Sequence, residues 1–331
     1  MEQRLVEEMF RCFVAGETVT KIKELGAGHV NRTWRVETGA DAYICQRLSR
    51  GALSGRTDAL AHNHRLYHDA CAGLADWTLP RWLRAAEGGV FSRDADGDAW
   101  RVYPMIRGRT HDTGGGLSDE TIRRFAEGLT VLHSALDRFA APPMTVIEHF
   151  HDLRHYYREF QTVCGSARAL PELNDRVERE MRDFSGELSF RQDAVIHADT
   201  RIGNAVFGAD ERVIAFIDTD TISLGCRLID VADSVRSVSC LRTAEGGRFD
   251  RRAYDVFVGA LCASPLCALS EEERAAIPAF LLRVTFELGL RYYTDYLRGN
   301  VYFRVKEPEE TLRRALGQLV LVDEIRKAFS Y

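Results

Sequence analysis

Residues 194–221 read AVIHADTRIGNAVFGADERVIAFIDTDT, and this stretch decides how the rest of the chain is interpreted. Short apolar runs at Ala194–Ile196 and Ala205–Phe207 predict two strands, and a third strand is predicted from Arg212 to Ile217. The second and third strands are separated by a turn at Gly208-Ala209-Asp210. The stretch therefore predicts a strand, a polar loop and a hairpin, followed by an acidic segment.

Three polar residues in this stretch have the spacing that phosphoryl transfer requires. Asn204 follows Asp199 by five positions, His197 lies two positions before Asp199, and Asp218 follows the predicted hairpin. One carboxylate must orient the attacking hydroxyl and accept its proton, while other oxygen ligands hold Mg²⁺ against the phosphates of ATP. Protein kinases place these groups in the same order. We therefore predict Asp199 as the catalytic base and Asn204 and Asp218 as ligands of Mg²⁺.

Other acidic residues nearby are open to more than one interpretation. The alternative to a catalytic stretch is an ordinary hairpin with polar turns. Asp220 and Asp230 could each act behind the reacting groups, or could be turn or cap residues. Asp233 is predicted to be structural or to cap a helix.

The sequence on either side predicts two lobes. Its 331 residues exceed one compact core of typical size. Strands are predicted at Thr18–Leu25, Thr33–Thr38 and Ala42–Leu48, whereas helical spacing dominates after about residue 107. We predict an α+β, bilobal, protein-kinase-like fold. Its strand-rich N-terminal lobe, residues 1–106, covers the nucleotide, and its mainly helical C-terminal lobe, residues 107–331, carries the catalytic loop and the acceptor site.

Composition excludes several other classes of protein. The net charge of −5 argues against nucleic acid as the main partner. The sequence contains no uninterrupted run of 18 apolar residues, so no membrane span is expected. The N-terminus has no signal-peptide pattern, and the eight cysteines form no C-x-x-C pair. We therefore predict a cytoplasmic protein whose partners are ATP and a small molecule, with no nucleic acid and no membrane.

Weaker patterns lie elsewhere in the chain. Gly26-Ala27-Gly28 separates two predicted strands, which suits either a turn near ATP phosphates or a plain hairpin. Asp94, Asp96 and Asp98 start like a calcium loop but lack the closing glutamate, and His149-Phe150-His151 with His155 is a poor zinc site. Ser270-x-x-Glu273 opens a helix that Pro278 is expected to kink or divide.

With these residues in place, the chain resembles the aminoglycoside phosphotransferase and choline kinase superfamily, and within it the N-acetylhexosamine 1-kinases. The resemblance covers nearly the whole chain, in segments that are Gly26–Asn31, Trp100–Tyr103, His149–Asp152, His197–Asn204, Ile217–Thr221 and Arg291–Phe303. It implies ATP between the lobes and a sugar on the larger lobe. The sugar contacts that it implies are His29, Asp199, Arg291 and Tyr302, and the nucleotide contacts are Gly26, Gly28, Gln46, Arg47, Tyr103 and Met105.

The chain departs from the kinase pattern at a few positions. The third strand of the small lobe lacks the lysine that grips phosphates, and offers Gln46 and Arg47 instead. Ala198 and Gly203 are small where relatives often carry larger polar residues, which leaves the identity of the sugar open.

Three functions remain to be compared. The first is a kinase that phosphorylates the anomeric hydroxyl of a hexosamine and makes a sugar 1-phosphate. The resemblance implies that C1 is the position phosphorylated, and a 6-phosphate is the chief alternative product. The second is a kinase of the same fold for an aminoglycoside, choline or another amino alcohol, which the positive charge of Arg291 would oppose. The third is an inactive binding module, which the missing lysine favours and the intact Asp199, Asn204 and Asp218 oppose.

Overall fold

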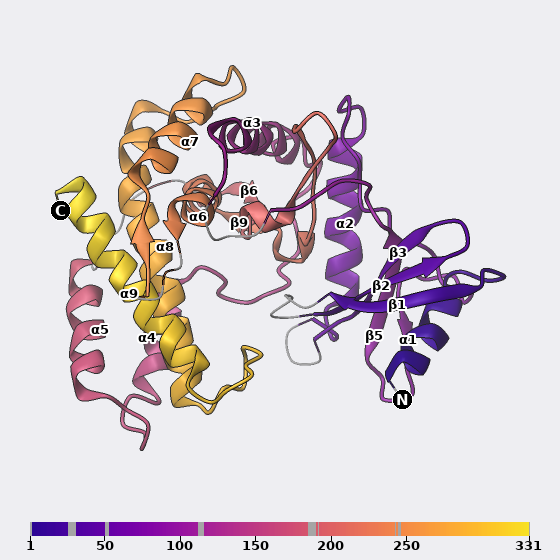
Figure 1. Cartoon of the computed structure of the whole chain (residues 1–331), viewed down its shortest axis with the longest axis horizontal. Coiled ribbons are helices and arrows are strands. Elements are labelled where there is room, and N and C mark those ends of the chain that lie inside the picture. The colour runs from indigo at the N-terminus through magenta and orange to yellow at the C-terminus, as the bar shows by residue number, and fades with distance from the viewer. Residues whose placement is uncertain are drawn as a thin grey trace.

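The computed structural model describes residues 2–25, 31–49, 53–111, 116–184, 190, 192–241, 243 and 246–330. Figure 1 shows a strand-rich part built from the first third of the chain, on the right, beside a larger helical part. The predicted α+β class, with strands first and helices after them, is confirmed. Within the described residues no helix is both long enough and apolar enough to span a membrane.

The N-terminal part is an antiparallel sheet of five strands in the order β1-β2-β3-β5-β4. One face packs on α1 through Phe10, Trp34 and Trp100, and the other forms a second cluster with Ile44, Trp82 and neighbouring residues. The elements of this part are α1 (Glu2–Arg11), β1 (Val19–Leu25), β2 (Arg32–Thr38), β3 (Ala42–Arg47), α2 (Thr57–Cys71), β4 (Ser92–Arg93) and β5 (Ala99–Pro104).

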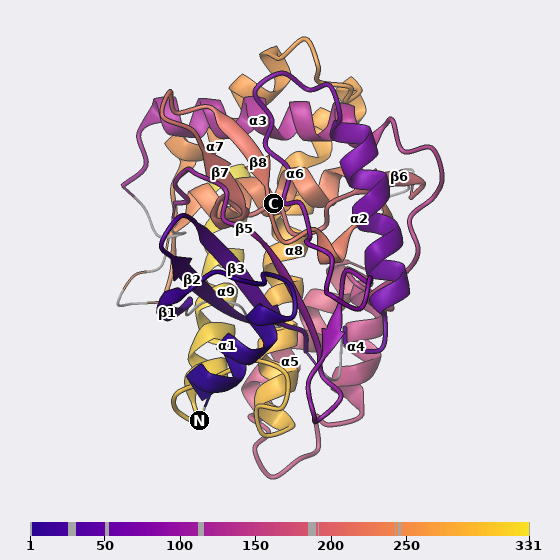
Figure 2. The same ribbon diagram turned by 90° about the vertical axis from the view of Figure 1, so that its right-hand side faces the viewer.

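The C-terminal part is a group of helices around three short strand pairs, and Figure 2 shows the N-terminal sheet lying in front of it. Its helices are α3 (Asp119–Leu136), α4 (Leu153–Gln161), α5 (Pro171–Asp183), α6 (Arg227–Ser239), α7 (Arg251–Ala263), α8 (Glu271–Leu297) and α9 (Glu310–Phe329). The strands pair as β6 (Ala194–Ile196) with β9 (Ser223–Gly225), β7 (Ala205–Phe207) with β8 (Val213–Phe216), and β10 (Cys240–Leu241) with β11 (Arg248–Phe249).

The start of α8 matches the sequence prediction, whereas its course does not. Ser270 and Glu273 form the predicted capping box. The helix then continues through Pro278 to Leu297 without a break, so the predicted division is wrong. Helices α4, α6 and α9 all contact α8, and this packing outweighs the one backbone hydrogen bond that a proline removes.

Helix α3 lies directly against strand β8 of the β7–β8 hairpin, and a glycine makes this approach possible. A Cβ atom placed on Gly128 would lie 2.5 Å from the Cβ of Val213 in β8. That separation is far below van der Waals contact, so the helix and the strand are this close only because residue 128 has no side chain.

The two lobes are joined by a buried ion pair. Both Nη atoms of Arg101, on β5, donate hydrogen bonds to the carboxylate of Asp220, at 2.6 and 2.8 Å. The Nε of Arg101 donates to Gln46 on β3 at 2.8 Å, and Asn31 donates to the Asp220 carboxylate at 2.9 Å. Arg101 and Asp220 are 2% and 3% exposed. Since bidentate pairs of this kind fix both position and angle, the sheet and the segment after β8 are held in one orientation.

We predict that Gly128→Ala lowers the free energy of unfolding by about 1–3 kcal/mol, because the new methyl group collides with Val213. Gly259, in α7, is the matched control, since a Cβ placed there would meet nothing within 4 Å. Gly259→Ala should stabilise the protein by about 0.5–1 kcal/mol through helix propensity. Urea unfolding of both variants tests this, and equal effects at the two glycines would contradict the close packing.

We predict that Arg101→Met lowers the free energy of unfolding by about 3–5 kcal/mol, because it leaves the Asp220 carboxylate buried and unpaired. The double variant Arg101→Met/Asp220→Asn should recover part of this loss, since the unpaired charge is then removed. Urea titrations of Arg101→Met, Asp220→Asn and the double variant make the comparison. A double variant as unstable as the sum of its single changes would show that the two side chains are not coupled.

Candidate active site

The loop after β6 is fastened to α6 by one carboxylate. Asp230, fully buried in the first turn of α6, accepts hydrogen bonds from the backbone N–H groups of His197 at 2.9 Å and Ala198 at 2.7 Å. The Thr200 hydroxyl donates to the Asp230 carbonyl at 2.6 Å. The sequence left open whether Asp230 supports neighbouring groups or ends a turn, and the structure shows that it holds the loop that carries Asp199.

The charge of Asp230 is kept by its partners. Burial alone would raise the pKa of this carboxyl, but His133, whose Nε2 lies 3.1 Å away, and the His197 side chain and amide bring the pKa below its usual value. The group is therefore an ionised acceptor, and hydrogen bonds to an ionised acceptor are stronger than neutral ones. Asp233 instead pairs with Arg236 at 2.6 Å within α6, which agrees with a structural role.

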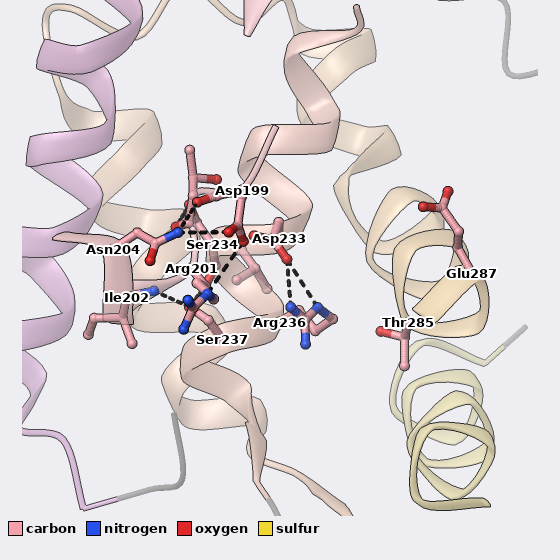
Figure 3. A network of polar contacts seen from close by, with 12 residues as sticks. Asp199, Arg201, Ile202, Asn204, Asp233, Ser234, Arg236, Ser237, Thr285 and Glu287 are labelled. Atoms are coloured by element: carbon pink, nitrogen blue, oxygen red, sulfur yellow. Dashed lines mark hydrogen bonds and ion pairs between the residues drawn. The ribbon is translucent and has the colours of Figure 1, made fainter. Parts of the chain in front are cut away.

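Asp199 is presented by a loop with an unusual backbone. Ala198, immediately before it, has φ +65°, in the left-handed region that alanine rarely adopts. Asn204 donates from Nδ2 to the Asp199 carboxylate at 2.8 Å and to its carbonyl at 2.9 Å, and Figure 3 shows the two side chains pointing toward one another. The Nε of Arg201 lies 3.5 Å from the other carboxylate oxygen.

These contacts set the ionisation of Asp199. Burial would raise the pKa of Asp199, but Arg201, His197 and the Asn204 hydrogen bond together lower it below the usual range. The side chain keeps 27% of its surface exposed, so a ligand can reach it. The arrangement therefore offers an ionised carboxylate that is able to accept a hydrogen bond from a hydroxyl group.

Asn204 and Asp218 flank the same end of the β7–β8 hairpin. Ala205 pairs with Phe216, and the Ile217 N–H donates to the Asn204 carbonyl at 2.9 Å, which brings positions 204 and 218 to one edge. The Asn204 Nδ2 is used by Asp199, so its Oδ1 is the atom left for a cation. An amide oxygen and a carboxylate are ligands that suit Mg²⁺.

The electrostatics of Asp218 also suit a cation. Burial, and then the neighbouring carboxylates of Asp220 and Asp199, raise the pKa of Asp218 to about 7. A divalent ion at this edge would offset that repulsion. Among the described residues no group of three His, Cys, Asp or Glu side chains gathers to hold a metal, so phosphate and water oxygens would have to complete the coordination.

The sequence-predicted nucleotide contacts on β3 face opposite ways. Gln46 lies on the inner side, where it donates to Thr33 at 3.0 Å and accepts from Arg101. Arg47 turns to the other face, where its Nε lies 2.7 Å from the Asp98 carboxylate, and Asp94 and Asp96 lie within 4 Å. The Arg47 guanidinium thus binds the carboxylates of the turn at 94–98, on the face of the sheet opposite Gln46.

The remaining predicted nucleotide contacts lie at the joint between the lobes or outside the described residues. Tyr103 is buried in the hydrophobic cluster on the face of the sheet away from α1, the cluster that also contains Ile44 and Trp82. Met105 follows β5, and its N–H donates to the Ala42 carbonyl at 2.8 Å, so this amide is not free to bind a base. Gly26, Gly28 and the predicted sugar contact His29 lie outside the described residues.

The structure does bring Arg291 and Tyr302 together. The Arg291 guanidinium, on α8, is surrounded by aromatic rings, with its carbon 5.0–5.8 Å from the ring centres of Phe150, Tyr156, Tyr302 and Phe303. Tyr302 is 41% exposed. A core tyrosine is therefore excluded at position 302, and the charge of Arg291 rests against ring faces.

Sequence reasoning missed the contacts of three residues, two beside the loop at 197–204 and one between the two lobes. His151 was considered only as part of a histidine cluster that was rejected as a zinc site. In the structure its Nε2 lies 2.8 Å from the Ala198 carbonyl and its Nδ1 lies 2.9 Å from Glu287. Glu287 sits one helical turn before Arg291 on α8, and this spacing was the signal that could have indicated it. Arg101 gave no signal, because its partner Asp220 lies far away in the sequence.

Comparison with solved structures shows the same architecture in several kinases. Choline kinase from Cryptosporidium parvum Iowa II superposes with a TM-score of 0.67 at 11% identity, over 99% of this chain and 96% of that chain. A microcompartment-associated aminopropanol kinase gives 0.65 at 16% identity, over 99% and 98%. Spectinomycin phosphotransferase in complex with ADP and spectinomycin gives 0.58 at 14%, over 98% and 97%. At these identities the likeness is one of fold, and it confirms the predicted kinase-like architecture.

The sequence also matches a family model, that of the phosphotransferase enzyme family, over residues 21–261. The match includes most of the N-terminal sheet, the loop at 197–204 and the hairpin before Asp218, and it spans more than half of the chain. The chain therefore belongs to the phosphotransferase enzyme family.

Proposed function

We propose that the protein is an ATP-dependent small-molecule kinase that requires Mg²⁺ and transfers the γ-phosphoryl group to a hydroxyl of its acceptor. The observation that carries this proposal is the placement of Asp199, ionised and reachable, beside Asn204 and on the same edge as Asp218. One group can accept a proton while the other two hold the metal, which is the division of labour that phosphoryl transfer needs.

In this proposal Asp199 accepts a hydrogen bond from the attacking hydroxyl and takes its proton as the new O–P bond forms. Asn204 Oδ1 and Asp218 would hold Mg²⁺, which would supply positive charge against the phosphate oxygens. The Asn204 amide keeps the Asp199 carboxylate turned toward the acceptor. The bond between the β- and γ-phosphates breaks, and ADP leaves with the electron pair.

The acceptor that we propose is a hexosamine or N-acetylhexosamine, phosphorylated at its anomeric hydroxyl to give a sugar 1-phosphate. Arg291 and Tyr302 support this choice, because a guanidinium and a phenol offer hydrogen bonds and flat surfaces to a neutral, hydroxyl-rich ring. Transfer to C1, rather than to the primary hydroxyl at C6, rests on the resemblance to the N-acetylhexosamine 1-kinases.

A second candidate acceptor is an amino alcohol, an aminoglycoside or choline. It is supported by the similarity in fold to choline kinase and to aminopropanol kinase. The charge of Arg291 opposes it, since a cationic acceptor beside this guanidinium would be repelled. The third alternative is an inactive binding module. It would be supported if the protein bound ATP or a sugar in the tests below without consuming ATP.

The proposal also assigns roles to the two lobes. The nucleotide lies between residues 1–106 and 107–331, with Gly26 and Gly28 near its phosphates and Tyr103 and Met105 near its base. Gln46 stands at about the position of the missing lysine, and it orients Arg101 by accepting a hydrogen bond from its Nε. His29 is a further proposed contact of the sugar. The protein acts in the cytoplasm without a nucleic acid or membrane partner.

We predict that the wild-type protein consumes ATP with free hexosamines or N-acetylhexosamines and yields a 1-phosphate. A panel of free sugars, their 1-O-methyl derivatives and amino alcohols tests the acceptor, and phosphorus–proton NMR of the product tests the position. Asp199→Asn is the matched variant, and loss of the base should slow turnover about 10²–10⁴-fold while ATP still binds.

Different outcomes of this panel contradict different parts of the proposal. Coupling of phosphorus to the C6 methylene protons, or phosphorylation of the 1-O-methyl sugars, overturns the anomeric assignment. Turnover with amino alcohols alone overturns the sugar. Wild-type turnover by Asp199→Asn removes Asp199 from its role as base.

We predict that Arg291→Ala weakens kcat/KM for the acceptor by about 1.5–3 kcal/mol, because a charged hydrogen bond to the sugar is lost, with little effect on the KM for ATP. Arg298→Ala is the control, since Arg298 follows the same helix but pairs with Glu159 at the surface. Steady-state kinetics with each substrate varied in turn decide the matter. A defect confined to the KM for ATP would refute the assignment.

A further inference from the structure

We propose that His151 is a positioning residue for the catalytic loop, acting as a doubly protonated imidazolium that clamps the peptide before Asp199. This inference rests on the proposed kinase function for its kinetic consequence, although its structural half can be measured without turnover. It gives a role to the histidine-rich segment at 149–155, which the proposed function leaves unused.

The contacts of the ring determine its protonation. Nδ1 of His151 lies 2.9 Å from the Glu287 carboxylate, and Nε2 lies 2.8 Å from the Ala198 carbonyl. Burial would raise the pKa of Glu287, but His151 and the charges of Arg291 and Arg283 lower it below the usual value, so this carboxylate is ionised and only accepts hydrogen bonds. The Ala198 carbonyl also only accepts, whereas a neutral imidazole has one N–H and one lone pair. A neutral ring would set its lone pair against one of the two oxygens. Only the imidazolium donates to both.

His197, in the same loop, makes a useful contrast. Its Nδ1 accepts from the Asp199 N–H at 3.3 Å and its Nε2 lies 3.1 Å from the Ile217 carbonyl. One partner donates and the other accepts, so a neutral ring satisfies both. The two histidines thus differ in the chemistry of their partners, and His151 alone of the pair needs the second proton.

The charges around His151 favour that proton. Glu287 is 1% exposed, and its Oε2 has no hydrogen-bond partner among the described residues. Burial would lower the pKa of His151, but Glu287 and the Ala198 carbonyl raise it above the usual value, against the opposing charge of Arg291. The other charged or titratable groups nearby are Arg283 on α8, Tyr156 on α4, Asp152 in the same segment, and His197, Asp199 and Asp230 at the catalytic loop.

The peptide that His151 binds is the strained one. Ala198 has φ +65°, a conformation in which the Cβ of an alanine is crowded by its own backbone. The Ala198 N–H donates a hydrogen bond to Asp230, and its C=O accepts one from His151, so both polar groups of the residue are fixed. Asp199 is the next residue, and its direction follows from that of the Ala198 peptide. Releasing the carbonyl would therefore let the base move.

The same contacts connect the loop to the helix that carries the acceptor residues. Arg283 donates to the His151 carbonyl at 3.1 Å, and Glu287 and Arg291 follow it on α8 at intervals of one turn. The imidazolium is therefore the bridge between α8 and Asp199. Its neighbours His149 and His155 stack on each other instead, with ring centres 4.3 Å apart.

The sign of the pH dependence follows from the raised pKa. Below the folded-state pKa the imidazolium makes both hydrogen bonds, and turnover has its full value. As pH rises through that pKa, the ring loses one proton and one contact, and the base is no longer fixed. We expect kcat to fall on the alkaline side, and the contribution of the ring to stability to fall over the same range.

The kinetic test compares kcat between about pH 6 and about pH 9 in four proteins. The wild type should show the alkaline fall. Glu287→Gln should abolish it, because a glutamine amide can donate to the Nδ1 lone pair of a neutral ring while Nε2–H still donates to Ala198. His151→Gln should lose about tenfold or more in kcat at every pH, with the KM for ATP within about twofold. His149→Gln, a control at a half-exposed histidine, should match the wild type.

The second test needs no turnover and no variant. Long-range ¹H–¹⁵N NMR of the histidine rings should show protons on both nitrogens of His151 at about pH 7. A singly protonated ring there overturns the inference, even if the protein is an active kinase. An alkaline fall that survives in Glu287→Gln also overturns it. Two ring protons in a protein without kinase activity would uphold the clamp while refuting the proposed function.

Discussion

The rest of the site depends on the hydrogen bonds that the Asp230 carboxylate accepts from the backbone N–H groups of His197 and Ala198. A single buried carboxylate, presented by the first turn of α6, fixes two successive amides of a loop that has no regular structure of its own. From this point the loop can hold Ala198 in a left-handed conformation, aim Asp199 outward and return through Asn204 to the hairpin. The site is thus built on the core of the larger lobe, and its precision follows from the rigidity of that core.

The charges of the site are balanced with one exception. Arg101 neutralises Asp220, Arg236 neutralises Asp233, and His133 supports Asp230, all by direct contact. Arg201 lies beside Asp199. Asp218 is the carboxylate of this group that has no ion pair with any described residue, and its pKa is raised to about 7 by burial and by neighbouring carboxylates. This distribution suits a cation at Asp218, and it keeps Asp220 occupied with the lobe-joining pair.

Local spacing in the sequence was sufficient to predict the order of strands and helices, and it singled out residues that lie close together at the candidate site. The five-residue interval from Asp199 to Asn204, and the hairpin before Asp218, are short-range patterns, and the structure brings these residues together. The contacts of Arg101 with Asp220 and of His151 with Glu287 join residues more than 100 positions apart, so no local pattern indicates either contact. The spacing of Glu287 and Arg291 on α8 could have drawn attention to Glu287, but not to its partner. Arg47 shows another limit. Strand alternation requires Gln46 and Arg47 to face opposite ways, but only the packed sheet reveals which one faces inward.

The central claim is that Asp218 and Asn204, rather than Asp220, receive the metal beside the base. A crystal structure with Mn²⁺ and a non-hydrolysable ATP analogue tests it most directly, because anomalous scattering locates the ion independently of the protein atoms. The account predicts a single strong peak within coordination distance of Asn204 Oδ1 and the Asp218 carboxylate, with Arg101 still paired to Asp220. A metal bound by Asp220, with Arg101 displaced, would contradict it.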